Sequence, residues 1–163
     1  MSELLLEVVK FVVQGLVLGG AGLLVTTIYS KKQQQLAEDE FNHKLLMRFN
    51  DWYDELNDNL HEIKTLENGK QEISLEYLKK QKPDLYSTLH DYLNLCAEEK
   101  LWNRKGRIDP IIWNSWVAGM NYWYKELQAL KELWGQEKKT TNKDSYYLKK
   151  SDDLFPETKR TDS

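Results

Sequence analysis

The chain has 163 residues, with 23 lysines and arginines against 26 aspartates and glutamates, so its formal net charge is −3. That length accommodates one compact domain with short extensions, and the acidic balance argues against nucleic acid as a partner, because phosphate binding needs clustered basic residues. The single cysteine, Cys96, excludes an internal disulfide and an all-cysteine metal site within one chain.

The first thirty residues are overwhelmingly apolar, although the mean hydropathy of the whole chain is −0.69. Residues 11–29 contain no charge, and Gln14 is their strongest polar interruption. About 20 apolar residues at roughly 1.5 Å each match a hydrocarbon core about 30 Å thick. The sequence therefore predicts a single transmembrane anchor over residues 1–30, with membrane lipid as a partner.

A cleavable signal peptide is the alternative for this segment. Glu3 and Glu7 disfavour it, because a signal peptide begins with a positive region, and no small-residue cleavage motif follows the apolar run. Lys31 and Lys32 directly follow the span, and basic residues stay on the cytoplasmic side. We therefore expect the N-terminus outside the cell and the rest of the chain in the cytoplasm.

Small residues in the anchor suggest a contact between two helices. Gly15, Gly19 and Gly22 follow a spacing that lets transmembrane helices approach closely, so they are a candidate face for a homodimer. The competing explanation is that glycine is simply common in membrane helices. A polar stripe on one side of the same helix fits the lipid headgroup region. Its members are Glu3, Glu7, Lys10 and Gln14.

Apolar residues then recur at steps of three and four, which predicts a long amphipathic helix. They are Phe41, Leu45, Phe49, Trp52, Leu56, Leu60, Ile63 and Leu66. The connector 31–40 contains neither Gly nor Pro, so this helix can continue directly from the anchor. We expect it to end at Asn68-Gly69.

Capping signals divide the remainder into further helices. Ser74 is a candidate N-cap for a short helix over 74–81, which ends before Pro83. A third helix runs from Pro83 to near Gly106, and its buried face is expected to hold Leu85, Leu89, Tyr92, Leu93 and Cys96.

The fourth predicted helix has the clearest boundaries. Asp109 is its expected N-cap, Pro110 its first residue, and Gly135 lies just past its expected end. Because no alternating apolar run occurs, strands are not expected. The prediction is an all-α fold, with a small three- to four-helix bundle over residues 31–135.

Residues 136–163 form a polar tail that we expect to be mostly mobile. Two apolar islands interrupt it, at 146–148 and 154–156. The first is interpreted as a strap laid across the helices. For the second, a strap and a docking peptide for another protein remain equally open.

Residues 92–124 read YLNLCAEEKLWNRKGRIDPIIWNSWVAGMNYWY, and ELWGQEK and SYYL follow at 132–138 and 145–148. This pattern resembles a family of uncharacterised bacterial proteins, often membrane-anchored, with an LNLCAEE-like helix, a Gly-x-Ile-Asp turn and a Trp-containing helix. In that family a glycine usually follows Ser-Tyr-Tyr, whereas this chain has Leu148. The resemblance covers the C-terminal third, and it implies a helical fold, a bacterial source and hence the inner membrane, but no catalytic residue.

The sequence carries only weak signals for a metal site or a catalytic site. Glu40 with His43, and Asp58 with His61, have a spacing used in di-iron bundles, but both pairs lie on the polar side of one helix, so we expect no metal or cofactor. An alternative hypothesis is an enzyme or metal protein with a site between the last two helices. It would use Glu98, Glu99, Asp109 and His90.

Adjacent helix positions point about 100° apart, so Glu98 and Glu99 cannot share one substrate by themselves. We expect one of them to pair with the basic turn 100–107, and Cys96 to be buried.

The aromatic residues favour a surface for an unknown protein partner. Its expected members are Trp113, Trp116, Trp123, Tyr146, Tyr147 and Phe155. The sequence thus favours a membrane-anchored, non-enzymatic interaction module. A phage-exclusion or stress accessory protein at the membrane is the alternative, beside the enzyme hypothesis.

Overall fold

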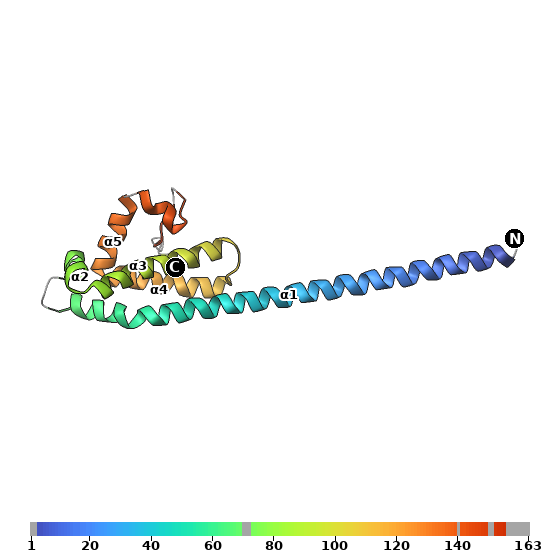
Figure 1. The fold of residues 1–163 in the computed structure, drawn as a ribbon, viewed down its shortest axis with the longest axis horizontal. Coiled ribbons are helices and arrows are strands. Elements are labelled where there is room, and N and C mark those ends of the chain that lie inside the picture. The colour runs from blue at the N-terminus through green and yellow to red at the C-terminus, as the bar shows by residue number, and fades with distance from the viewer. Residues whose placement is uncertain (1–2, 70–72, 140, 150–151, 156–163) are drawn as a thin grey trace, which may run out of the picture. The chain divides into compact units, whose positions relative to one another are not determined.

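A computed structural model describes residues 3–69, 73–139, 141–149 and 152–155, without the side chains of 4–5, 15–24 and 141–143. The described residues form helices and no strand, which confirms the all-α prediction (Figure 1). The elements are α1 (Glu3–Glu67), α2 (Leu75–Gln81), α3 (Pro83–Arg104), α4 (Pro110–Glu126), α5 (Gln128–Lys139) and the 3-10 helix η1 (Thr141–Tyr146). Contacts divide the chain into two units, Met1–Lys44 and Leu45–Ser163.

The first unit consists of helix α1 up to Lys44. The helix has no break between the apolar segment and the amphipathic segment, as the connector composition predicts. Within the described part of the chain, no helix has the length and apolarity that a membrane crossing requires. The transmembrane anchor predicted over residues 1–30 therefore rests on the sequence alone.

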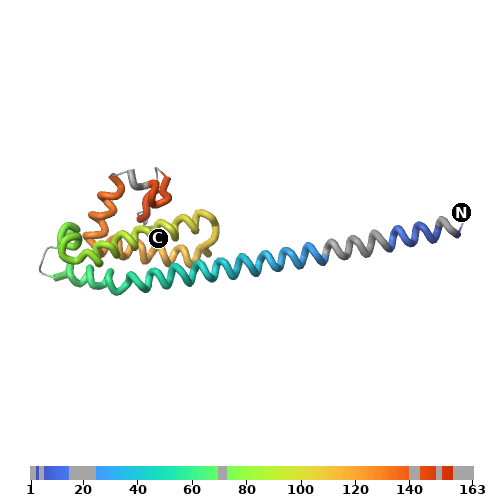
Figure 2. The backbone as a smooth tube through the Cα atoms, viewed as in Figure 1, coloured from blue at the N-terminus to red at the C-terminus, as the bar shows by residue number. Residues whose placement is uncertain are grey.

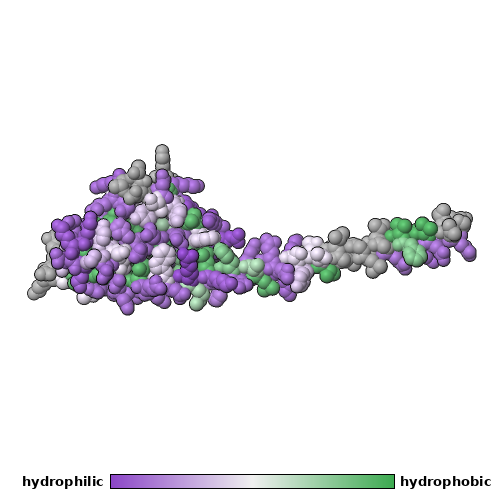
Figure 3. Space-filling model, in the orientation of Figure 1, coloured by the Kyte–Doolittle hydropathy of each residue, from purple (hydrophilic) through white to green (hydrophobic). Residues whose placement is uncertain are grey.

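The predicted dimer face of Gly15, Gly19 and Gly22 lies outside the described side chains. Large apolar side chains on either side of that gap are exposed. Before that gap, apolar residues gather on one side of the helix and polar residues lie on the other (Figure 3). The exposed apolar side chains on both sides of the gap include Leu6, Val8, Val9, Phe11, Val12, Val13, Val25, Ile28 and Tyr29.

The second unit contains the core. The last part of α1 packs with α3 and α4. Phe49 lies edge-on to Trp116 of α4, with 5.5 Å between ring centroids, and Asn59 Nδ2 donates to Thr88 Oγ1 of α3 at 2.9 Å. The predicted apolar face of α3 is buried throughout. Local caps agree with the sequence: Ser74 Oγ accepts a hydrogen bond from Tyr77 N at 3.2 Å, and Gly106 turns the chain with φ +66°.

The prediction of the fourth helix is wrong for its second half. Asp109 caps it as expected and accepts from Ile111 N at 2.7 Å, but α4 ends at Glu126. Leu127 is extended, with φ −99° and ψ 113°, and α5 begins at Gln128. Gly135 therefore lies inside a helix and does not end one. Figure 2 shows α5 leaving the end of α4 in a new direction.

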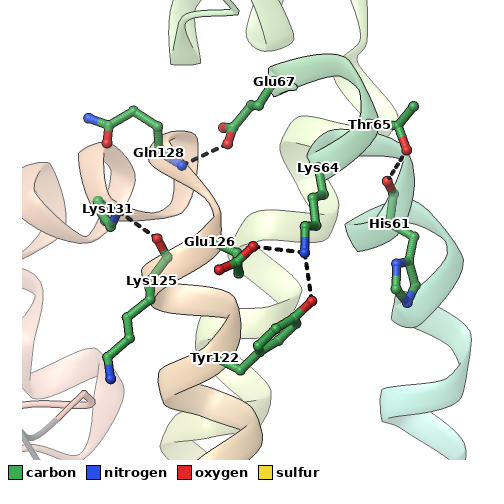
Figure 4. Close-up of polar contacts among 9 residues, drawn as sticks. All are labelled: His61, Lys64, Thr65, Glu67, Tyr122, Lys125, Glu126, Gln128 and Lys131. Carbon is green, nitrogen blue, oxygen red and sulfur yellow. Dashed lines mark hydrogen bonds and ion pairs between the residues drawn. The ribbon is translucent and has the colours of Figure 1, made fainter. Parts of the chain in front are cut away.

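Polar contacts on both sides of Leu127 stabilise this break (Figure 4). The Glu67 carboxylate accepts from the backbone NH of Gln128, as Figure 4 shows, and from that of Ala129, each at 2.8 Å. Lys131 Nζ donates to the carbonyl of Lys125 at 2.7 Å. These contacts satisfy backbone groups that a helix break leaves without intrahelical partners. The end of α1 therefore acts as the cap of α5.

Some of the described residues after 139 belong to the core, and the expected boundary of the tail at 136 falls inside α5. Tyr146, Leu148, Leu154 and Phe155 are all buried. We call the described residues 144–149 and 152–155 the strap. The strap interpretation of the first island agrees with the burial of Tyr146 and Leu148, and the described residues of the second island, Leu154 and Phe155, are buried as well.

Candidate functional site

A cavity of about 250 Å³ lies inside the second unit, between α1, α3 and α4. Helical spacing explains its composition, because residues three, four and seven positions apart share one side of a helix. On α3 this rule brings Tyr92 and Glu99 to the cavity, while α1 contributes Asn50 and Tyr53. Trp116 and its neighbours Ser115, Gly119 and Met120 line it from α4.

Glu99 is the only ionisable carboxyl among the residues that line this cavity. Its exposed fraction is 6%, and none of the described residues gives it a hydrogen bond or an ion pair. Burial raises the pKa of Glu99 to about 8, because an uncompensated charge is costly in a poorly hydrated place. At neutral pH the side chain is therefore mostly a neutral acid that can donate one hydrogen bond.

The groups around Glu99 are neutral as well. Burial raises the pKa of Tyr92 and of the Cys96 thiol, both on the same helix. Tyr53 Oη accepts a hydrogen bond from Trp123 Nε1 at 2.9 Å, which fixes its position. No basic residue lines the cavity; its wall combines three aromatic rings and one acid with small polar and aliphatic groups.

The expected pairing of Glu98 or Glu99 with the basic turn is wrong. Glu98 lies 3.9 Å from Arg48 on α1, and Glu99 faces the cavity. The basic side chains of this turn hold the strap instead. Arg104 donates to an Asp152 carboxylate oxygen at 3.2 Å and to the carbonyl of Tyr147.

The strap is also fixed from α5 and by ring packing. Asp153 accepts hydrogen bonds from Trp134 Nε1 at 2.8 Å and from Lys138 Nζ at 3.1 Å, and its backbone carbonyl accepts from Lys100. Phe155 stacks on Tyr124 with ring centroids 4.3 Å apart. These contacts explain why the second apolar island is buried.

The residues of the enzyme hypothesis are not brought together. Among the four, Glu99 alone lines the cavity, while Asp109 caps α4 and His90 packs edge-on against Tyr86 at 4.9 Å. The described structure therefore does not assemble these four residues into one site.

The six residues of the expected interaction surface do not lie together either. Trp123, Tyr146 and Phe155 are core residues, with exposed fractions of 5% or less, so a partner cannot contact them in this conformation. Trp113 and Trp116 are half-buried, and Tyr147 is exposed. The six residues accordingly do not form one surface.

The E-x-x-H spacings do not build a metal site among the described residues, where no three His, Cys, Asp or Glu side chains converge. Glu40 instead forms an ion pair with Lys44 at 2.6 Å, and the His61 ring lies edge-on to Trp123 at 4.9 Å.

The sequence patterns do not single out Asn50 and Tyr53, and they give Glu99 only as one of the four residues of the enzyme hypothesis. A signal for Glu99 was present, because it lies three positions after Cys96 and seven after Tyr92 on the apolar side of α3. For Tyr53 no local signal exists, since its role depends on the packing of α1 against α4.

Comparison of the chain with family models, with curated proteins and with solved structures finds no match. The resemblance carried by residues 92–124 and the later SYYL segment therefore stays a prediction.

Proposed function

We propose that the chain is a membrane-anchored, non-enzymatic protein-interaction module. In this proposal, residues 11–29 lie in the bacterial inner membrane and the helical unit Leu45–Ser163 lies in the cytoplasm. The observation that carries it is the exposure of large apolar side chains along the N-terminal part of α1, where Phe11 is 78% exposed and Val25 is 67% exposed.

Water is a poor environment for such a helix. A helix that shows apolar side chains over a long stretch needs lipid or protein to cover them. The uncharged stretch 11–29 has the length of a bilayer core at about 1.5 Å per residue. Lys31 and Lys32 favour a cytoplasmic location for the residues C-terminal to them. Lipid is therefore the occupant that the sequence supports best.

The second unit supports a role in binding more than in catalysis. Its cavity has a single carboxyl group, and α4 shows apolar residues to solvent, with Ile111 80% exposed and Tyr122 44% exposed. Anchoring raises the effective concentration of such a surface near membrane partners. Self-association through Gly15, Gly19 and Gly22 would add a homodimer to this proposal.

The anchor is tested by fractionating cells that express the full-length chain. The wild-type protein should stay with the membranes through an alkaline carbonate wash. The double variant Leu18→Arg, Leu23→Arg should move to the supernatant, because each arginine near the middle of a span costs about 2.5–3.5 kcal/mol.

Leu36→Arg is the matched control, because Leu36 is an exposed apolar residue of α1 beyond the proposed span. This variant should remain with the membranes. Wild-type protein in the supernatant, or equal behaviour of the double variant and the wild type, would contradict the proposal.

A further inference from the structure

The cavity between α1, α3 and α4 combines two features that recognise positive charge. One is Glu99, whose carboxyl is 6% exposed and has no partner among the described residues. The other is the aromatic wall of Tyr53, Tyr92 and Trp116. Aromatic rings attract cations through their quadrupole, and a buried carboxylate needs a positive partner to remain charged.

The remaining wall disfavours anionic ligands. No lysine, arginine or histidine lines the cavity, so a phosphate or carboxylate ligand would find no counter-charge. Asn50 and Ser115 add polar groups for orientation, and Met120 adds a polarizable one. The volume of about 250 Å³ lies below the usual range for drug-sized ligands, which begins near 300 Å³.

We propose that this cavity binds a small organic ammonium cation, with the Glu99 carboxylate as its counter-ion and the rings of Tyr53, Tyr92 and Trp116 as its walls. The occupied site satisfies the Glu99 side chain, which has no partner among the described residues. The proposal concerns the second unit only, so it does not depend on the membrane anchor.

Binding of a permanent cation should release a proton from Glu99. With a pKa of about 8, about a tenth of Glu99 is ionised at pH 7 and about nine-tenths at pH 9. Affinity should therefore rise about tenfold between these values, because only the ionised form pairs with the ligand. The ionisable groups that face Glu99 are Tyr53 on α1 and Tyr92 and Cys96 on α3, and none comes from α4.

The test uses full-length protein in a non-ionic detergent and titration calorimetry with choline as the probe. The matched neutral probe is 3,3-dimethylbutan-1-ol, which has the same shape without the charge. Choline should bind saturably, and the neutral probe should bind about tenfold or more weakly. At pH 7 the heat of choline binding should change with the ionisation enthalpy of the buffer, which reports the released proton.

Two variants distinguish binding at the Glu99 carboxylate from an effect of overall charge. Glu99→Gln keeps the shape of the side chain and removes its charge, so choline affinity should fall about tenfold or more. Glu98→Gln removes the neighbouring charge, which faces Arg48, and should bind choline as the wild type does. Near-ultraviolet circular dichroism confirms that each variant is folded.

Three results would overturn the proposal: no saturable binding of choline, equal affinity for the neutral probe, or unchanged choline binding by folded Glu99→Gln. Because the calorimetry uses detergent-purified protein, failure of the anchor proposal leaves this test intact.

Discussion

Replacing Glu67 with alanine removes the cap of α5. The carboxylate of this residue is the acceptor that the described structure gives to the backbone NH groups of Gln128 and Ala129. Leu127, which precedes them, has an apolar and fully buried side chain, so it cannot serve as a capping residue. The variant therefore leaves both NH groups without their partner.

The expected cost follows from the two hydrogen bonds. Loss of a helix cap costs about 0.5–2 kcal/mol, and water replaces a lost acceptor only where it can reach. Gln128 is exposed, whereas Ala129 is fully buried. We therefore expect Glu67→Ala to lower the free energy of unfolding by about 2 kcal/mol, and Glu67→Gln, which keeps one acceptor oxygen, by about 1 kcal/mol.

Urea unfolding of the full-length chain in detergent, followed by near-ultraviolet circular dichroism, measures this loss, because all six tryptophans lie after residue 44. Glu55→Ala is the matched control, since Glu55 is an exposed residue of α1 without a polar contact among the described residues. A loss for Glu67→Ala that equals the loss for Glu55→Ala would refute the capping argument.

Three further predictions concern single side chains. Asp153→Ala should lower the free energy of unfolding by about 1–3 kcal/mol, because the indole of Trp134 loses its acceptor; urea unfolding measures this. Between pH 5 and 8 the wild type should lose stability relative to Glu99→Gln by a few kcal/mol, because the raised pKa of Glu99 makes the folded state bind more protons than the unfolded state. Glu98→Gln keeps Glu99, so it should lose stability over this range as the wild type does; equal pH dependence of the wild type and Glu99→Gln would contradict the prediction. Cys96 should react with iodoacetamide only in denaturant, because burial shields the thiol and raises its pKa; equal rates in native and unfolded protein would contradict this.

Local signals in the sequence predicted most helix boundaries correctly. Ser74, Asp109 and Gly106 act within a few residues of their own positions, so their roles could be inferred from neighbouring residues alone. The buried face of α3 follows in the same way from helical spacing.

The remaining features depend on residues far apart in the chain. The break at Leu127 has no Gly or Pro, and its cap is Glu67, which lies 61 and 62 positions before the NH groups that it accepts from. The burial of Phe155 requires Tyr124 and Trp134. Helical spacing predicts which residues share a side of a helix, but it does not predict which helix covers that side.

For the same reason, the cavity could be predicted only in part. Tyr92 and Glu99 lie on one side of α3, and spacing places them together. Tyr53 joins them through the packing of α1, where Trp123 Nε1 donates to its hydroxyl.

Site-directed thiol labelling in intact bacteria tests the membrane anchor and its orientation together. Cys96 is buried and should give little background, so a cysteine can be introduced at Ser2 or at the exposed Ser145 in the full-length chain. A membrane-impermeant maleimide should label Ser2→Cys in intact cells, and it should label Ser145→Cys only after lysis. Labelling of Ser145→Cys in intact cells, or protection of Ser2→Cys, would contradict a chain anchored through residues 11–29 with its helical unit in the cytoplasm.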